Sequence, residues 1–246
     1  AQKIIDMVDL SRDAYENDSK GIPGYPRLSK AEIKKLGLDP SLYYSDKDKS
    51  GFYASIYKDQ KNGGYAVAMR GTEGEFNDVI SDAAQGIGIS NVQYDKTYEL
   101  AKDLRRNPTI NKVNMTVTGH SLGGGLAATT GSITGYPTYT FNAAGVHKNT
   151  MKKYGISDAN TKHVQAYNTE KDPLNMIQDN RKGAIASIGA VASIINPLGG
   201  LIGPTASATG ALPKAIGTRT KIPTDDGYGV GAHNTDGMRK ALAKNL

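Results

Sequence analysis

The chain of 246 residues contains no cysteine and carries a formal net charge of +6 at pH 7, with a sequence pI near 9.2. The lack of cysteine excludes a disulfide framework, a thiolate metal site and a cysteine nucleophile, and the length fits one α/β domain, with or without an appended subdomain. The positive charge favours an anionic partner such as a membrane surface. No basic run is long enough, or interleaved enough with aromatic residues, to indicate nucleic-acid binding.

Residues 1–50 are polar and interrupted by glycine and proline, and two short helices are expected in them. The apolar residues of Ile4–Val8 are spaced to suit one side of an opening helix. Ser29, with Glu32 three residues later, has the spacing of a capping box and predicts the start of a second helix. We therefore expect an N-terminal helical cap, followed by an α/β domain at residues 51–246.

Residues 46–51 read Asp-Lys-Asp-Lys-Ser-Gly, like the first half of a calcium-binding loop with oxygen ligands at alternate positions. The twelfth position of such a loop would be Tyr57, where a bidentate glutamate is required. We interpret the segment as a polar turn and expect neither a metal ion nor another cofactor.

Two strands are then expected at residues 52–58 and 65–70, joined by a turn at Asn-Gly-Gly, residues 62–64. The hairpin leads into Arg-Gly-Thr at residues 70–72. Further along, an amphipathic helix is expected from four residues on one side: Tyr94, Tyr98, Ala101 and Leu104. An aromatic stripe of this kind is more typical of a core than of a ligand site.

Residues 113–130 read VNMTVTGHSLGGGLAATT, a β-branched run followed by small residues that can begin a helix. A sharp strand-to-helix turn of the form Gly-x-Ser-x-Gly lifts a serine hydroxyl clear of the backbone, where a base can activate it. Gly119 and Gly123 flank Ser121 at points where the turn brings backbone against backbone and a Cβ would collide. The sequence therefore predicts a nucleophile elbow with Ser121 as the nucleophile.

After the elbow helix, strands are expected at residues 138–142 and 163–168. Strands that alternate with helices indicate an α/β sheet that is largely parallel around the elbow. In such sheets the chemistry takes place at the carboxyl ends of the strands. Ser121, Asp172 and Thr72 all follow expected strands closely, which makes them candidates for one site.

Residues 184–215 differ in composition from the rest of the chain, being built from Ala, Gly, Ile, Ser and Pro without a charge before Lys214. Asn-Pro at 196–197 and several glycines interrupt the stretch, which argues against a membrane-spanning helix. Two interpretations stay open for an insert at about residues 183–216. It is either a packed helical hairpin or a mobile apolar lid that contacts the membrane.

Four histidines could serve as the base for Ser121. His120 adjoins the serine, and the elbow should turn its side chain away from the hydroxyl, so packing is the better interpretation. His147 precedes the candidate acid in the chain, and His163 opens a strand. His233, just before a short C-terminal helix, is therefore the predicted base.

Asp172 is the predicted carboxylate partner of His233, because it gives the chain order Ser, Asp, His that an α/β-hydrolase uses. Its carboxylate would accept the Nδ1 proton and leave Nε2 free to take the proton of serine. Asp225 and Asp226 are rivals because they are close to His233 in sequence, and Asp179 is a weaker one.

The oxyanion of an acyl transfer needs two donors. The first is expected to be the backbone N–H of Leu122, directly after the nucleophile. The second should come from an earlier strand-to-helix loop, and Thr72 fits with its N–H and its hydroxyl.

The sequence resembles the class 3 lipase family in six segments: Gly-Phe-Tyr-Ala-Ser-Ile-Tyr at 51–57, Ala-Met-Arg-Gly-Thr at 68–72, Asp78 with Asp82, Gly-His-Ser-Leu-Gly-Gly at 119–124, Asp172-Pro173, and His233. The resemblance covers about residues 50–245 and is closest to bacterial lipase-type effector and toxin domains. The family usually carries tryptophan after the position of Asp78, where this chain has Val79, so the packing of its lid departs from the family pattern.

The resemblance implies an α/β-hydrolase with a mostly parallel central sheet flanked by helices. Ser121, Asp172 and His233 would be its triad. Thr72 and Leu122 would be its oxyanion donors. The expected activity is that of a serine esterase, phospholipase A1-like, that cleaves acyl esters of membrane lipids through an acyl-serine intermediate. Two alternatives stay open: a thioesterase or peptidase with the same triad, and a non-catalytic membrane-active toxin domain.

The chain begins at Ala1 without methionine or an apolar signal core, so we expect it to be mature or cut from a longer protein. The expected setting is a secreted bacterial effector, delivered to the periplasm or membrane of a target cell. Membrane phospholipid would be its substrate. A cognate immunity protein that inhibits it would protect the producer.

Overall fold

The computed structural model describes residues 1–45, 50–71, 91–179, 213–225, 227 and 230–246. Its helices and strands in chain order are α1 (Gln2–Asp13), β1 (Gly21–Ile22), β2 (Tyr25–Pro26), α2 (Lys30–Lys35), the 3-10 helix η1 (Pro40–Leu42), β3 (Tyr53–Lys58), β4 (Tyr65–Arg70), α4 (Asn91–Arg106), β5 (Met115–His120), α5 (Leu122–Thr134), β6 (Thr138–Phe141), α6 (Lys148–Lys153), the 3-10 helix η2 (Asp158–Thr161), β7 (Val164–Thr169), α7 (Pro173–Asp179), β8 (Thr218–Ile222), α9 (Val230–His233) and α10 (Thr235–Asn245).

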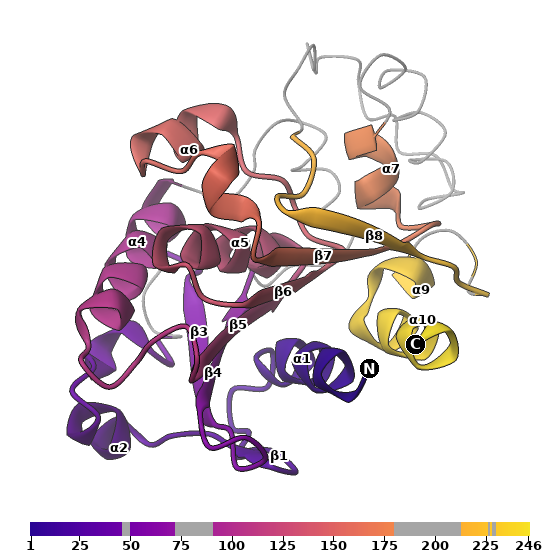
Figure 1. The fold of residues 1–246 in the computed structure, drawn as a ribbon. Helices are drawn as coiled ribbons and strands as arrows, with labels where there is room; N and C mark the ends of the chain where they lie inside the picture. Colours follow the sequence, from indigo (N-terminus) through magenta and orange to yellow (C-terminus); the bar gives the residue numbers. More distant parts are fainter. Residues whose placement is uncertain (46–49, 72–90, 180–212, 226, 228–229) are drawn as a thin grey trace.

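A sheet with the strand order β3-β4-β5-β6-β7-β8 forms the centre of the molecule (Figure 1). β3 and β4 form the expected antiparallel hairpin, in which Tyr53 lies opposite Arg70. Each further pair of neighbours, from β4 to β8, is parallel. The carboxyl ends of β4 to β8 therefore meet at one edge of the sheet, and the expected largely parallel α/β sheet is confirmed.

The capping box expected at Ser29 and the turn expected at residues 62–64 are both confirmed. The hydroxyl of Ser29 accepts a hydrogen bond from the backbone N–H of Glu32 at 3.1 Å, and the backbone N–H of Ser29 donates to the carboxylate of Glu32 at 2.6 Å. This is the capping box that was expected at the start of α2. In the turn between β3 and β4, Gly63 has a φ of 81°, in the left-handed region that glycine tolerates.

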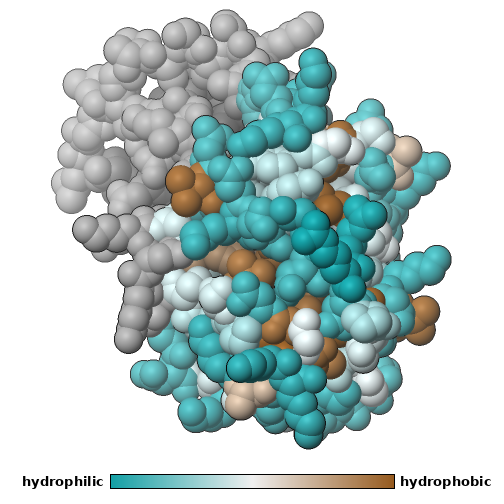
Figure 2. Space-filling view, turned by 90° about the vertical axis from the view of Figure 1, so that its left-hand side faces the viewer, coloured by the Kyte–Doolittle hydropathy of each residue, from teal (hydrophilic) through white to brown (hydrophobic). Residues whose placement is uncertain are grey.

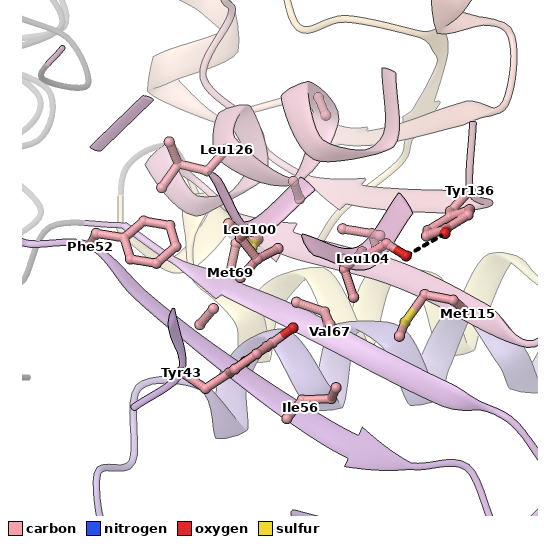
Figure 3. Close-up of a cluster of buried hydrophobic side chains, with 14 of the residues drawn as sticks. Tyr43, Phe52, Ile56, Val67, Met69, Leu100, Leu104, Met115, Leu126 and Tyr136 are labelled. Atoms are coloured by element: carbon pink, nitrogen blue, oxygen red, sulfur yellow. Dashed lines mark hydrogen bonds between the residues drawn. The ribbon is translucent and has the colours of Figure 1, made fainter. Parts of the chain in front are cut away.

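Helices cover both faces of the sheet: α4, α5 and α6 lie on one face, and α1, α9 and α10 lie on the other (Figure 1). The core under α4 and α5 is shown in Figure 3. Of the expected stripe of α4, Tyr94 and Leu104 are buried in this core, and Leu100 lies there with them. Tyr136 closes one end, where its hydroxyl donates to the carbonyl of Leu104 at 3.1 Å.

The opening helix α1 lies directly against the sheet and beside α10, so the two chain termini are neighbours (Figure 1). Met7 and Leu10 of α1 are fully buried, in a cluster with Phe141 of β6. The hydroxyls of Ser11 and Thr118 also meet at 2.8 Å within this interface. The expected opening helix is confirmed, whereas the division into a cap and an α/β domain at residue 50 stays a prediction.

On the side of α2 and α4, the surface is mostly hydrophilic and its hydrophobic side chains form small separate groups (Figure 2). Among the described residues, the large hydrophobic side chains with substantial exposure are Val92, Val113 and Leu246. None of the described helices is both long and apolar enough to cross a membrane.

Several expectations concern residues outside those that the structure describes. They are the calcium-like loop at residues 46–49, the oxyanion donor Thr72, and the apolar insert over residues 180–212. Within the described part of the chain, no group of three or more His, Asp or Glu side chains could hold a metal ion.

Candidate active site

Ser121 is the single residue between β5 and α5, since β5 ends at His120 and α5 begins at Leu122. Its φ of 56° and ψ of −127° lie in a region that residues other than glycine rarely adopt. The surrounding backbone holds this conformation: the N–H of Ser121 donates to the carbonyl of Phe141 at 3.1 Å, and the N–H of Ala144 donates to the carbonyl of Ser121 at 2.9 Å. A sharp, strained strand-to-helix turn at the centre of a largely parallel sheet confirms the α/β-hydrolase fold.

The two glycines that flank Ser121 are required by close backbone contacts. A Cβ on Gly119 would lie 2.3 Å from the carbonyl oxygen of Gly123. A Cβ on Gly123 would lie 2.2 Å from the carbonyl oxygen of Met69 on β4. Both distances are far below van der Waals contact, so neither position accepts a side chain without moving the backbone.

Three side chains that are far apart in the sequence form one hydrogen-bonded series. Nε2 of His233 lies 2.9 Å from Oγ of Ser121, and Nδ1 of His233 lies 2.6 Å from Oδ1 of Asp172. Since a carboxylate only accepts, Nδ1 carries the proton and donates it to Asp172, while Nε2 accepts from the serine hydroxyl. The three residues are 5% (Ser121), 4% (His233) and 0% (Asp172) exposed, so water competes little for these hydrogen bonds.

The carboxylate of Asp172 is held at both of its oxygens. Asp172 directly precedes α7, and its Oδ2 accepts from the backbone N–H of Asn175 at 2.9 Å, as an N-cap carboxylate does. The side-chain amide of Asn175 donates to the same oxygen. Oδ1 is therefore directed to the imidazole of His233 while Oδ2 is occupied by α7.

The rival aspartates have other partners. Asp179 lies 2.8 Å from the guanidinium of Arg219 on β8. Asp225 lies 2.5 Å from the ammonium of Lys244 on the surface. Asp226 is outside the described residues.

Two of the other histidines are tied to local structure, as expected. His147 caps α6, where its Nδ1 accepts from the N–H of Asn149 at 3.2 Å. His163 donates from Nε2 to the carbonyl of Gly131, 2.6 Å away, at the end of α5. Neither has a hydrogen bond to Ser121.

His120 is buried, as expected for a packing residue, and its ring meets that of Tyr15 edge-on at 6.4 Å. It also has a role that the sequence analysis missed, because its Nε2 lies 2.6 Å from the carbonyl oxygen of His233. Burial, and secondly the nearby imidazole of His233, lower the pKa of His120 to about 3, so the ring is neutral.

Asn142 and Asn175 were also missed, and both are almost fully buried beside the series of three side chains. The available signal in the sequence was weak. Asn142 directly follows β6, with a φ of 43°, and asparagine is among the few residues that tolerate that conformation. No local pattern separates such an asparagine from an ordinary turn residue.

Leu122, the expected first oxyanion donor, directly follows Ser121. As the first residue of α5, it has a backbone N–H without a carbonyl acceptor inside the helix. A Cβ on Gly71 would lie 2.6 Å from Cβ of Leu122, so the chain just before Thr72 runs against the elbow. Thr72 itself is outside the described residues, and its role stays a prediction.

Comparison with known proteins gives one family and one curated relative. A family model for the Tle-like phospholipase domain matches residues 6–226. The extracellular phospholipase A1 of Serratia liquefaciens is 33% identical over 193 residues, which are 76% of this chain and 58% of that protein. The chain thus spans less than two thirds of the length of this relative.

Two solved structures are similar at lower identity. A mutant form of MDLA from Penicillium cyclopium is 20% identical, with a TM-score of 0.43, and the match covers 70% of this chain and 72% of that one. The nonglycosylated LIP2 lipase of Yarrowia lipolytica is 14% identical, with a TM-score of 0.45, and the match covers 92% of this chain and 78% of that one.

Proposed function

The chain belongs to the family of Tle-like phospholipase domains, and from this membership we propose that it is a serine esterase that hydrolyses acyl esters of membrane phospholipids. The lipase resemblance drawn from the sequence is confirmed by this membership. The observation that carries the proposed chemistry is the hydrogen-bonded series from Ser121 through His233 to Asp172. This order of nucleophile, base and carboxylate supports acyl transfer to serine.

In the acylation half-reaction, Oγ of Ser121 attacks the ester carbonyl carbon while its proton passes to Nε2 of His233. The carbonyl oxygen becomes an oxyanion, for which the N–H of Leu122 and the donors of Thr72 are the proposed partners. The bond from carbon to the leaving oxygen then breaks, and His233 returns its proton to the departing alcohol. The products of this half are an acyl-serine and a lysophospholipid.

In the deacylation half-reaction, water attacks the acyl carbon and gives one proton to Nε2 of His233. Oγ of Ser121 leaves and takes that proton back, so a free fatty acid is released and the enzyme is restored. Asp172 keeps the Nδ1 proton in place throughout and stabilises the imidazolium that forms twice in each cycle.

The proposed substrate class has three sources of support besides the family description. The relative from Serratia liquefaciens is described as an extracellular phospholipase A1. The net charge of +6 favours adsorption to an anionic lipid surface. The uncharged stretch at residues 184–213 has a composition suited to contact with acyl chains.

The proposed setting is outside the producing cell, as the description of the same relative indicates for that protein. We keep as proposals the delivery of this domain to a target cell as an effector, and its inhibition by a cognate immunity protein. Both follow from chemistry that would damage the membrane of the producer itself.

The decisive experiment is mass spectrometry of products from vesicles of mixed phospholipids and triglycerides, incubated with the wild type and with Ser121→Ala. Wild type should release fatty acid and 2-acyl lysophospholipid in equal amounts. Ser121→Ala should lose on the order of 10⁴-fold or more of that rate while still binding the vesicles. Ser132→Ala is the matched control, because Ser132 is a buried serine of α5 whose hydroxyl has no hydrogen-bond partner among the described residues.

Other outcomes would replace the proposal. Phospholipid hydrolysis that survives Ser121→Ala would show that Ser121 is not the nucleophile. Cleavage of thioesters or peptides without phospholipid turnover would favour the thioesterase or peptidase alternative. Leakage of vesicles that is equal for wild type and Ser121→Ala, without products, would favour a non-catalytic membrane-active domain.

A further inference from the structure

The proposed base, His233, is the last residue of a very short helix, which has few hydrogen bonds of its own to fix the position of that residue. α9 consists of residues Val230–His233, a single turn. The last carbonyl groups of a helix have no partner inside it and must be satisfied from outside. At this helix end the carbonyls of Ala232 and His233 accept hydrogen bonds from side chains at the edge of the sheet.

Three neighbouring strands supply these donors. Nδ2 of Asn142, directly after β6, donates to the carbonyl of Ala232 at 2.9 Å and to that of His233 at 3.0 Å. Nε2 of His120, at the end of β5, donates to the carbonyl of His233 at 2.6 Å. Oγ1 of Thr169, at the end of β7, donates to the carbonyl of Ala232 at 2.5 Å. The backbone of the base is thus held by the sheet.

The oxygen of the Asn142 side-chain amide is connected to the proposed acid, Asp172, through Asn175. Its Oδ1 accepts from the backbone N–H of Thr169 at 2.9 Å and from the side-chain amide of Asn175 at 3.3 Å. That amide of Asn175 also donates to Oδ2 of Asp172. The fully buried side chain of Asn142 therefore contacts both the backbone of the proposed base, His233, and the amide of Asn175 that holds the carboxylate.

We propose that Asn142 is a positioning residue, which sets the distance between the imidazole of His233 and the carboxylate of Asp172. This inference rests on the function proposed for the same site. Proton transfer depends on the separations of 2.9 Å and 2.6 Å on the two sides of the imidazole. A misplacement of about 1 Å in such a site can lower the rate by about 10²-fold.

The backbone at residue 142 allows the side chain to be removed cleanly. Its φ of 43° lies in the left-handed region, where glycine costs less than any other residue. Asn142→Gly therefore deletes the amide and keeps the turn. Asn142→Asp keeps the shape, but an ionised carboxylate cannot donate to the carbonyls of Ala232 and His233.

Asn142→Gly is expected to lower kcat for a soluble short-chain ester by about 10²-fold while KM changes by less than about threefold, because the amide is fully buried. Asn142→Asp should lose at least as much kcat. The matched control is Asn168→Ala on β7, since Asn168 is also almost fully buried and neither polar atom of its amide has a hydrogen bond within the part of the chain that the structure describes. This control should keep the kcat of the wild type.

A second measurement does not depend on turnover. The proton that His233 Nδ1 donates to Asp172 should give a far-downfield ¹H resonance, observed with ¹⁵N-labelled histidine and assigned with His233→Gln. In Asn142→Gly this resonance should be lost to exchange with water, while the melting curve stays cooperative. If Asn142→Gly does not fold, Asn175→Ala replaces it, because this change breaks the link to Asp172 and leaves the turn intact.

The outcomes separate the two proposals. Absence of Ser121-dependent hydrolysis in the wild type would defeat the proposed function, and the resonance would still test positioning. An active wild type with kcat within threefold in Asn142→Gly and an unchanged resonance would overturn the positioning role. A rise in KM with an unchanged kcat in Asn142→Gly would overturn the positioning role as well.

Discussion

Nε2 of His120 lies 2.6 Å from the main-chain carbonyl oxygen of His233. Because a carbonyl can only accept, this nitrogen carries the proton of a neutral imidazole. Burial is the main reason that the pKa of His120 falls to about 3, and the ring of His233, 4.9 Å away between centroids, adds to it. The residue next to the proposed nucleophile is therefore an uncharged donor at neutral pH.

Because the pKa of His120 is lowered in the folded state, the free energy of unfolding depends on pH. The unfolded chain takes up this proton below its ordinary pKa of 6.5, whereas the folded chain does so only near about 3. This contribution is thus complete above pH 6.5 and is lost as the pH falls toward 3. Between pH 7 and 4.5, wild type should lose about 2 to 3 kcal/mol more unfolding free energy than His120→Gln, which cannot titrate.

Urea unfolding of the two proteins at both pH values measures this difference. Glutamine keeps an amide donor for the carbonyl of His233, so the comparison at pH 7 controls for the lost ring. Equal losses in the two proteins would show that His120 is already protonated in the folded state, or that another group dominates the acid response.

Asp172→Asn should lower kcat by on the order of 10⁴-fold, because an amide can donate to Nδ1 and stabilise the tautomer that places the proton on Nε2. Asp179→Asn is the control, since Asp179 pairs with Arg219 on β8 and should leave kcat near that of wild type. The assay is hydrolysis of a soluble ester, with circular dichroism to check the fold. A large loss for Asp179→Asn together with a small one for Asp172→Asn would reverse the assignment of the acid.

Gly123→Ala should destabilise the protein by more than about 2 kcal/mol, since the new Cβ would lie 2.2 Å from the carbonyl oxygen of Met69 and must push β4 away from the elbow. Gly227→Ala is the matched control, because a Cβ there meets no atom of the described residues within 4 Å. Thermal denaturation compares the two. A melting temperature of Gly123→Ala equal to that of the control would mean that the elbow relaxes without cost.

Asp13→Ala should cost about 3 to 5 kcal/mol of unfolding free energy, because it leaves a buried guanidinium without its partner. Nε of Arg27 lies 2.9 Å from Oδ2 of Asp13, both side chains are under a tenth exposed, and the hydroxyl of Tyr57 donates to the same oxygen at 2.8 Å. This cluster connects the end of α1 with β3.

The control for this change is Asp225→Ala, which breaks the 2.5 Å ion pair of Asp225 with Lys244 on the open surface. Water and salt screen such exposed pairs, so this change should barely alter the free energy of unfolding. Chemical denaturation of both variants gives the comparison. Similar small losses in the two would show that water reaches Arg27 once the carboxylate is removed.

Features that depend on neighbours along the chain could be predicted from the sequence. The capping box of Ser29 and Glu32, the hairpin and the elbow around Ser121 are all local patterns, because short-range sterics and hydrogen bonds decide them. The apolar spacing of α4 likewise predicted its buried side. For the site, the chain order of known hydrolases was enough to rank Asp172 and His233 above their rivals.

Other features depend on contacts between remote parts of the chain, which local sequence patterns do not encode. α1 was expected as a helix, but its place on the sheet beside α10 depends on contacts between the two ends of the chain. The same holds for His120, Asn142 and Asn175. Their hydrogen bonds exist only because parallel pairing brings the ends of β5, β6 and β7 together beneath α9. A buried asparagine acquires such a role from its neighbours in space, and those neighbours are remote in sequence.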